Sequence, residues 1–461
     1  MEMSKQELKS HRSMYEKSYD ATHHLKKIDE VVDWTFIRKS LRRYYSQDQG
    51  RPSYDPLILV KILFIQVVEG FRSVRMTCRQ VDQHYTYRWF LGLHVDQAAP
   101  KHSTISYFLN HRLDGIVFWR NLFNMILLLI KKKGYLANET WAADETEIKA
   151  NANKRNREVA YILKQKPNTN KHLDIINTAR SKLNRKKLSP STVKYEVQKY
   201  YISPVDPDAR LSVKHEIHGQ FAYFEHRIVD TLHRFIIATT VTGANVPGHR
   251  ILMSQLKAVE NCLDLKPLEI VLDAGYYNAD LIRELVHSNI TPYISYKRFK
   301  NNQHPKCKNA HFKQINDSLY VCRQGIPFYH VNTTRQGYHI YQPPKGSCQN
   351  CPYQQKADED RLLRISIHQP YYDIARNNRL SPRGKQLKPV RSSTIELSFA
   401  NSKELHGMRY ARYRGALKVM RQVLTTAIVQ NLLRFANLES AKKMGWFLTY
   451  EPIIKKFEEF E

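Results

Sequence analysis

Three carboxylates lie within or just after short apolar segments of the sequence. Asp144 is part of residues 141–148, Asp273 follows the apolar run 270–272, and Glu396 precedes a basic segment. A carboxylate in a buried strand is costly unless a cation compensates its charge, and a divalent metal ion does so well. In open α/β sheets, ligands bind at the carboxyl ends of strands, where Asp273 is expected. The three acids are therefore candidate metal ligands.

Two-metal phosphoryl transfer is the chemistry that such acids perform together. Sites of this kind use hard carboxylate oxygens to hold two Mg²⁺ ions about 3.5–4 Å apart. One ion activates water or a 3′-hydroxyl, and the other stabilises the leaving oxygen. Each acid alone has an ordinary alternative role, because a strand-terminal Asp often caps a turn and Glu396 has many basic neighbours for salt bridges. The acids are far apart in the chain, so only a folded sheet brings them together.

Other side chains near these acids compete for the same role. Glu145 and Glu147 flank Asp144, and Asp230 ends another expected strand, so all three are candidates for an outer layer of the site. Tyr276 and Tyr277 follow Asp273, where they could stack on an unpaired base or pack against the next helix. The proposed chemistry needs no histidine.

The composition favours a polyanionic partner. The chain has 461 residues, with 73 Lys and Arg against 43 Asp and Glu and a formal net charge of +30. Its hydrophobic fraction of 42% suffices for a sizeable core, and its length suggests about three domains. Nucleic acid is the commonest polyanion for so basic a protein. Charge alone does not separate an enzyme from a DNA-binding protein without catalysis.

Several classes of protein are not expected. The tightest apolar run, residues 125–130, ends at three lysines and is far shorter than the about 20 residues of a membrane span. Residues 1–10 are polar and contain no signal-peptide core. Six cysteines in a chain of this length do not make a disulfide scaffold. We therefore expect a cytosolic protein with no membrane partner.

Residues 1–135 are expected to form a helical N-terminal DNA-binding domain. Asp55 and Pro56 are an N-cap and a first-turn proline, Gly70 marks a helix end, and Ser73 caps a further helix. Short helices follow at 85–91 and from 102 onward. Their basic residues are compatible with a helix-turn-helix-like DNA reader or with a helical bundle of basic surface. These residues are Arg72, Arg75, Arg79 and Arg88.

Residues 136–296 are expected to form the first part of an α/β core. Short β-branched or aromatic runs bounded by turn residues come first in series and then alternate with helices, which favours a mixed sheet. The expected strands are 140–148, 221–230, 235–242, 268–273 and 291–296, and the expected helices are 249–262 and 280–286. A loosely helical basic insertion is expected at 154–200, where 13 Lys and Arg meet 3 Asp and Glu.

The remaining chain is expected in two parts. Residues 297–390 are rich in Tyr, Gln, Asn, Pro and Cys and are typical of an irregular or short-stranded insertion. Residues 391–461 return to helix as the last part of the core, with strong helix character over 403–435. This stretch has no acid between Leu405 and Leu438. Its basic side chains Arg409, Arg412, Arg414 and Lys418 are candidate phosphate contacts.

Over roughly residues 51–435, the chain resembles the bacterial insertion-sequence transposases of the DDE type. The N-terminal helical domain of that family is similar to RPSYDP at 51–56, GFRSVR at 70–75, YRWFLG at 87–92 and PKHST at 100–104. The first catalytic motif resembles DETEIKANAN at 144–153, and DPDAR at 206–210 resembles a recurrent segment. The second motif resembles AGYY after Asp273, and the third resembles Glu396 with Phe399, Lys403, 406–407 and 414–415. Order, spacing and neighbours agree over several hundred residues.

The resemblance implies an α/β fold with an RNase H-like mixed-sheet catalytic core, an all-α N-terminal domain, and insertions in the core. It makes Asp144, Asp273 and Glu396 the catalytic and metal-binding triad, with two Mg²⁺ ions that Mn²⁺ could replace. Lys403 becomes the basic residue seven positions after the glutamate. Seven residues are about two helical turns, so Lys403 and Glu396 share a face and Lys403 is a DNA contact.

Two positions depart from the family pattern. The third motif often has an Arg four residues before its glutamate, whereas here Ser392 has that position and Arg391 comes one residue earlier. Relatives often have a cysteine cluster between the second and third motifs. Cys322, Cys348 and Cys351 are possible zinc ligands, but Ala357 stands where a further cysteine is expected. Because structural Zn²⁺ needs four ligands, a degenerate site or reduced thiols in ordinary packing is the competing interpretation.

The implied function is that of a DNA transposase of an insertion sequence. Such an enzyme cleaves the element ends by hydrolysis and joins the freed 3′-hydroxyl to target DNA, without a covalent enzyme intermediate. Its partners are the terminal repeats and target DNA, and the synapsis of two ends implies a homodimer in the bacterial cytosol. The alternative is a catalytically silent DNA-binding protein derived from a transposase. A general RNase H-like nuclease would cut without joining.

Overall fold

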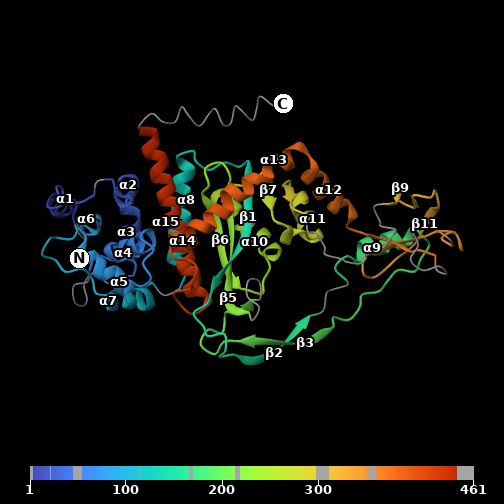
Figure 1. The fold of residues 1–461 in the computed structure, drawn as a ribbon, viewed down its shortest axis with the longest axis horizontal. Coiled ribbons are helices and arrows are strands. Elements are labelled where there is room, and N and C mark those ends of the chain that lie inside the picture. Colours follow the sequence, from blue (N-terminus) through green and yellow to red (C-terminus); the bar gives the residue numbers. More distant parts are fainter. Residues whose placement is uncertain are drawn as a thin grey trace.

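Three regions follow one another along an elongated molecule (Figure 1). The computed structural model describes residues 4–20, 22–44, 54–113, 115–165, 170–212, 219–296, 311–349, 351 and 360–443. Helices form one end, a mixed sheet covered by helices forms the middle, and a small antiparallel sheet forms the other end. The limits of the predicted domains remain a prediction.

The N-terminal region is helical, as the sequence predicts. Asp55 accepts a hydrogen bond from the Leu57 N–H and Ser73 accepts one from the Met76 N–H, so both predicted caps are confirmed. Gly70, at φ +64°, ends the fourth helix. The helices are α1 (Lys5–Ser13), α2 (His24–Val31), α3 (Thr35–Arg42), α4 (Pro56–Val68), α5 (Val74–Gln83), α6 (Tyr85–Leu91), α7 (His102–Tyr107), the π-helix η1 (Phe108–Arg112) and α8 (Val117–Lys132).

The DNA-reading role considered for Arg88 is wrong. Its guanidinium is buried and donates hydrogen bonds to the backbone carbonyls of His94, Val95 and Gln97 at 2.7–2.9 Å. The turn after α6 leaves these carbonyls without helical partners, and the arginine satisfies them. Arg88 therefore stabilises this turn. The other three arginines of the predicted DNA reader, Arg72, Arg75 and Arg79, are exposed.

The central sheet confirms the mixed-sheet α/β core. Its strands lie in the order β4-β5-β1-β7-β8, and β6 pairs with the other edge of β5. β1 is antiparallel to β5 and parallel to β7, which is parallel to β8. The strands are β1 (Thr140–Lys149), β4 (Arg210–Ser212), β5 (Gln220–Asp230), β6 (Ile236–Gly243), β7 (Glu269–Leu272) and β8 (Thr291–Ile294). All five predicted strands are present within two residues at each end.

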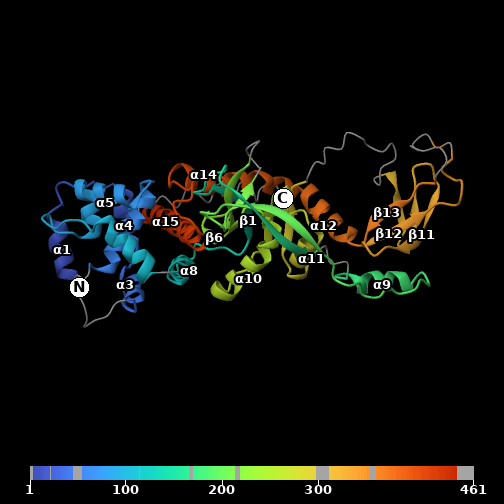
Figure 2. The same cartoon turned by 90° about the horizontal axis from the view of Figure 1, so that it is seen from below.

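Helices cover both sides of this sheet. Figure 2 shows α10 (Leu252–Leu263) and α11 (Ala279–His287) on one side and α14 (Leu397–Glu404) on the other. Two short 3₁₀ turns, η2 (Gly248–Arg250) and η3 (Ala274–Tyr276), precede α10 and α11. One apolar core joins the side chains of the sheet to those of the N-terminal helices, so the two regions share their packing.

The basic insertion is more regular than predicted. Strands β2 (Glu158–Gln165) and β3 (Tyr195–Ile202) pair antiparallel over eight residues, with α9 (Leu173–Ser181) between them. Exposed Tyr161, Tyr195 and Val197 lie on this ribbon. β-branched and aromatic residues favour a strand even where both faces are exposed to solvent. The prediction of a loosely helical insertion rested on its basic charge and overlooked these residues.

The second insertion forms a five-stranded antiparallel sheet in the order β13-β12-β11-β10-β9. The strands are β9 (Lys313–Asn316), β10 (Leu319–Val321), β11 (Pro327–Thr333), β12 (Tyr338–Gln342) and β13 (Leu363–Ser366). We call it the outer sheet. The chain then returns through α12 (Gln369–Leu380) and α13 (Pro382–Arg391), which pack against β8 and β7 of the central sheet.

The C-terminal helix is divided, in contrast to the single predicted helix over 403–435. A π-helix, η5 (Ser392–Glu396), leads into α14, and α15 (Ala416–Lys443) begins only after an eleven-residue connection. Gly407 and Gly415 have φ +66° and +88°, conformations that an L side chain rarely adopts and that interrupt a helix. α15 then packs against β6, α8, α2 and α4.

Among the described helices, no single one is long and apolar enough to cross a membrane, although the bent pair 102–112 and 117–132 passes by length and composition when taken together.

Candidate active site

The central sheet places Asp144 and Asp273 side by side. Ala143 of β1 pairs in parallel register with Leu272 of β7, so each acid is the next residue along its strand. Neighbouring strands lie about 4.8 Å apart, which brings the two carboxylates to one point of the sheet edge. Asp273 also accepts a hydrogen bond from the Gly275 N–H at 2.8 Å. The turn-capping role and the predicted ligand role of this aspartate are compatible.

Glu396 reaches the same place from a helical segment that packs on the sheet. It ends η5, which contacts both β1 and β5. The Arg391 guanidinium lies between two of the acids, with Nη1 2.7 Å from Asp144 Oδ2 and Nη2 2.5 Å from Glu396 Oε1. The predicted acids from β1, β7 and η5 are therefore brought together in the fold. Their catalytic role remains a prediction.

The π-helix explains the departure in the third motif. Its hydrogen bonds join residues five positions apart, and one turn therefore holds one residue more than an α-helical turn. Arg391 precedes Glu396 by five residues, and the two side chains meet across this turn. The π-helical turn therefore accommodates the extra residue between Arg391 and Glu396. Ser393, which lies within the turn, donates from its hydroxyl to the Val390 carbonyl at 3.1 Å.

Tyr276 shows that the acids share one electrostatic environment. Burial raises the pKa of Tyr276 well above its usual value, and the negative charges of Asp144, Glu145 and Asp273 raise this pKa further. The charge of Arg391 acts in the opposite direction. A phenol that senses three carboxylates at once lies where their field is concentrated. Such a concentration of negative charge attracts cations.

The competing acids fall into two groups. Glu145 lies near the site, because a Cβ added to Gly248 would meet both its Oε2 atom and the Tyr276 hydroxyl within 3 Å. Glu147 instead accepts hydrogen bonds from Ser212 at 2.6 Å and Gln220 at 3.1 Å. Asp230 pairs with Trp141, three residues before Asp144, and accepts from the His233 N–H. Burial raises the pKa of Asp230 to about 6. Glu147 and Asp230 therefore have structural partners of their own.

A buried ion pair attaches α14 to the sheet. Arg227 of β5 lies opposite Asp144 and forms an ion pair with Glu225 at 2.6 Å, and both side chains are fully buried. Its guanidinium also donates to the hydroxyls of Ser398 and Ser402, at 2.7 and 2.9 Å. This network fixes the helix that follows Glu396. The sequence offered no signal for it, since the contacts join residues more than 170 positions apart.

The predicted DNA contacts differ in exposure. Lys403 is half-buried in α14, while Arg409, Arg414 and Lys418 are exposed on the connection and on α15. Arg409 forms an ion pair with Glu404, and Arg414 donates to the Asn151 carbonyl at 3.1 Å. Arg412 points inward instead: it donates to the His406 carbonyl, and burial lowers the pKa of its guanidinium. The contacts with DNA remain a prediction.

The three cysteines named as possible zinc ligands lie near one another in the connections of the outer sheet. Burial raises the pKa of Cys348, and the neighbouring Cys351 and Cys322 thiols raise this pKa further. Within the described part of the chain, the group of side chains close enough to share a metal ion is a different one, His172, Asp280 and His368. No sequence pattern singles out these residues, because they come from three separate segments.

Comparisons with known proteins found two family matches and a similar solved structure. Residues 13–111 match the family described as "Transposase domain (DUF772)", and residues 321–436 match the family described as "Transposase DDE domain". Glu396 and Lys403 lie within the second match, whereas Asp144 and Asp273 lie between the two. No curated protein matches the chain. A cryo-EM structure of a piggyBac transposase synaptic complex with hairpin DNA is similar at TM-score 0.37 and 10% identity, over 93% of this chain and 77% of that one.

Proposed function

We propose that this chain, a transposase of the DDE type, cleaves the ends of an insertion sequence and joins them to target DNA. It matches a transposase domain toward its N-terminus and a DDE domain toward its C-terminus. The observation that supports this proposal is the convergence of Asp144, Asp273 and Glu396 from β1, β7 and η5. Acids on three distant segments meet at one sheet edge, where two-metal chemistry requires them.

The residues present fit divalent metal ions. The Arg391 guanidinium bridges Asp144 and Glu396, so a cation already lies between two of the proposed ligands. Carboxylate oxygens are the ligands that Mg²⁺ prefers, and Mn²⁺ accepts the same set. Asp144, Asp273 and Glu396 would hold the ions, which supply Lewis-acid stabilisation of charge on the phosphoryl oxygens and lower the pKa of bound water.

The protein side chains orient the DNA around this centre. The Arg227 network holds α14 against β5, so Glu396 and Lys403 keep a fixed position relative to Asp144. Lys403 provides a cation for a phosphate next to the reacting one. Arg391 would be able to bind a phosphate as well, once its contacts with Asp144 and Glu396 are released. Its planar guanidinium suits bidentate contact with phosphate oxygens.

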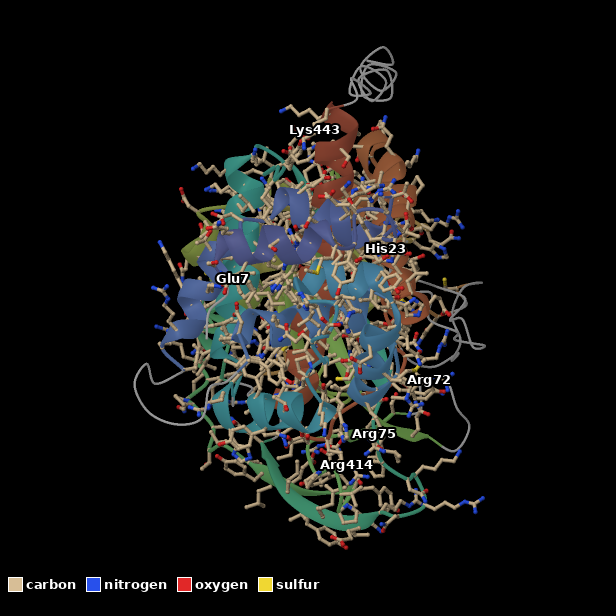
Figure 3. The ribbon with its side chains drawn as sticks, turned by 90° about the vertical axis from the view of Figure 1, so that its left-hand side faces the viewer. Glu7, His23, Arg72, Arg75, Arg414 and Lys443 are labelled. Carbon is tan, nitrogen blue, oxygen red and sulfur yellow. The ribbon has the colours of Figure 1, made fainter. Side chains whose placement is uncertain are left out.

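The basic N-terminal end of the molecule supplies further phosphate contacts. Arg72 and Arg75 are exposed on the turn before α5 and on its first turn. In Figure 3, which looks at the N-terminal end along the length of the molecule, Arg72, Arg75 and Arg414 are labelled in the lower half of the view. The terminal repeats of the element are the proposed ligand of this surface, and target DNA is the second partner. Because joining requires two ends, we propose a homodimer in the synaptic complex.

Cleavage and joining of labelled element-end DNA in Mg²⁺ test the proposal. Asp144→Asn keeps the side-chain shape and removes the charge, so we expect DNA binding to persist and both products to disappear. Glu147→Gln is the matched control, since Glu147 lies on the same strand and its hydrogen bonds to Ser212 and Gln220 can be retained by the amide. This variant should cleave and join as the unaltered protein does.

Two results would overturn the proposal. DNA binding without any turnover in the unaltered protein would indicate the catalytically silent DNA-binding alternative. Hydrolysis without a joined product would indicate a nuclease.

A further inference from the structure

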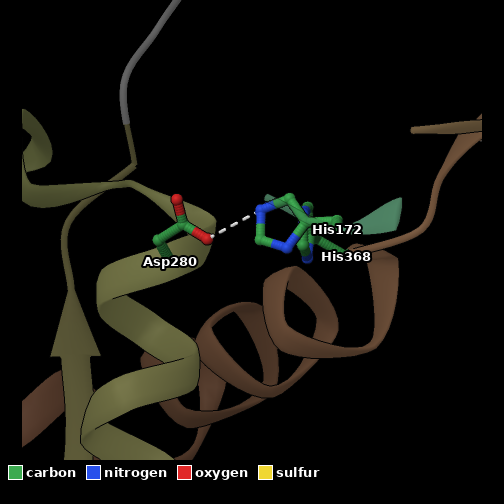
Figure 4. A group of neighbouring side chains, drawn as sticks. All are labelled: His172, Asp280 and His368. Carbon is green, nitrogen blue, oxygen red and sulfur yellow. Dashed lines mark ion pairs between the residues drawn. The ribbon is translucent and has the colours of Figure 1, made fainter. Parts of the chain in front are cut away.

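Three potential metal ligands meet at a place away from the carboxylate centre (Figure 4). His172 directly precedes α9 in the basic insertion, Asp280 lies in the first turn of α11, and His368 directly precedes α12. One ligand atom from each residue lies within 4.8 Å of the other two. The cluster therefore joins the basic insertion, the central core and the end of the outer sheet.

One buried nitrogen atom in this cluster lacks a hydrogen bond. Lys171 Nζ donates to Asp280 Oδ2 at 2.7 Å, which leaves Oδ1 facing His172 Nε2 at 3.2 Å. Among the described residues, His368 Nδ1 is buried and has no hydrogen-bond partner. Asp280 Oδ1 is buried too, but it lies within ion-pair distance of His172 Nε2 and, at 3.7 Å, of Arg283 Nη2. Leaving a buried polar atom unsatisfied is unfavourable, so the unpartnered nitrogen of His368 needs an explanation.

The protonation states suit a metal ion. Burial lowers the pKa of both His172 and His368, and Arg283 and Lys171 lower these pKa values further, whereas the Asp280 carboxylate acts in the opposite direction. For Asp280, burial would raise the pKa, but the hydrogen bond from Lys171 and the neighbouring charges lower it below the usual value. At neutral pH the imidazoles are neutral and the carboxylate is ionised. These are the forms that bind metal ions.

We propose that His172, Asp280 and His368 bind one divalent transition-metal ion, with Zn²⁺ as the best match to the ligand types. Two imidazoles and a carboxylate are a common ligand set of zinc, with a fourth position for water. With metal–ligand bonds of about 2.0–2.1 Å, two ligands in tetrahedral geometry lie about 3.3 Å apart. The 3.2 Å separation between His172 Nε2 and Asp280 Oδ1 already has this value. Only His368 has to move closer.

Binding requires a small rearrangement of protons and neighbours. His172 Nδ1 lies 3.4 Å from Arg283 Nη1 and accepts from it, so the ring proton is on Nε2. When Nε2 binds the metal, this proton moves to Nδ1 and Arg283 loses that contact, without net release of a proton. Lys171 and Arg283 oppose a cation here. Since the Lys171 side chain is 48% exposed, solvent screens much of its effect.

The ion would act as a structural clamp. The basic insertion, α11 and α12 come together at this cluster, and α11 follows the turn that contains Asp273 by a few residues. An ion at this place would fix the outer sheet and the insertion relative to the core. This inference concerns metal binding alone and stands independently of the proposed reaction.

The test uses the full chain with the substitution Asp144→Asn, which weakens divalent-metal binding at the carboxylate centre. After removal of metals with a chelator, the protein is titrated with Co²⁺ and followed by visible absorption, then by competition with Zn²⁺. We expect one equivalent to bind through nitrogen and oxygen ligands. His368→Gln and Asp280→Asn should each lower the affinity by more than about 100-fold, beyond what loss of an outer-layer contact costs.

His339→Gln is the matched control, because His339 is another half-buried histidine, located in the outer sheet beside His330. It should leave the affinity unchanged. A thiolate-to-cobalt absorption band would assign the binding to cysteines and overturn the proposal, as would unaltered affinity in both ligand variants. If those variants do not fold, Lys171→Ala decides. It retains all three ligands and removes a repelling cation, so we expect several-fold tighter binding, and an unchanged or weaker affinity overturns the proposal.

Discussion

Arg227→Met should strongly destabilise the central core. The substitution removes the ion pair of 2.6 Å and leaves the Glu225 carboxylate fully buried, with the Thr239 hydroxyl as its remaining hydrogen-bond donor. Breaking one side of a buried ion pair costs about 3–5 kcal/mol, because the other charge stays in a medium that solvates it poorly. The hydroxyls of Ser398 and Ser402 lose their donors as well, so α14 should loosen with the sheet.

The assay compares thermal unfolding of the full chain with local hydrogen exchange in α14. For a region of 150–250 residues, each kcal/mol lowers the Tm by about 2–4 °C, so we expect a decrease of about 6–20 °C. The double variant Glu225→Gln with Arg227→Met removes both charges and should recover a large part of this loss. A decrease below about 2 °C, or a double variant no better than the single one, would refute this reasoning.

Three further predictions concern other parts of the chain. Arg75→Ala should weaken DNA binding and reduce the slope of log affinity against log salt concentration by about one unit, without changing the Tm. Arg88→Met should instead lower the Tm. Binding and thermal-unfolding measurements on both variants test this difference. Burial lowers the pKa of His226 to about 4, so folding favours its neutral form. The contribution of this histidine to stability is complete above its unfolded pKa of about 6.5 and is lost as the pH falls toward 4. For His226→Asn we therefore expect the unfolding free energy to depend less steeply on pH. Gly70→Ala would place a Cβ 2.6 Å from the Leu405 carbonyl oxygen at φ +64°, and should increase proteolysis of the connection before α15.

Local signals determined the elements that the sequence predicted well. The caps at Asp55 and Ser73 act within one helical turn, and the β-branched runs around Asp144 and Asp273 define strands by their own composition. The parallel pairing of these two strands, which puts both acids at one sheet edge, had no such local signal. Only the resemblance to the transposase family grouped the acids at the level of the sequence.

Contacts between distant segments could not be predicted in this way. The bridge from Arg391 to Asp144 spans 247 residues and depends on a π-helical turn, for which the sequence has no simple signature. Arg88 points inward because a turn leaves backbone carbonyls without partners, and its guanidinium donates to them. From the sequence alone, this arginine was interpreted as a surface charge. The His172 cluster assembles three segments that become neighbours only after both insertions have folded.

The central claim is that Asp144, Asp273 and Glu396 form one metal centre for DNA cleavage and joining. The most direct test is an experimental structure of the protein bound to element-end DNA and Mn²⁺, with the ions located by their anomalous scattering. We predict two ions in contact with these three carboxylates and Arg391 displaced from Asp144. With the DNA end bound, ions that contact none of the three acids, or an Arg391 that remains between Asp144 and Glu396, would contradict the account.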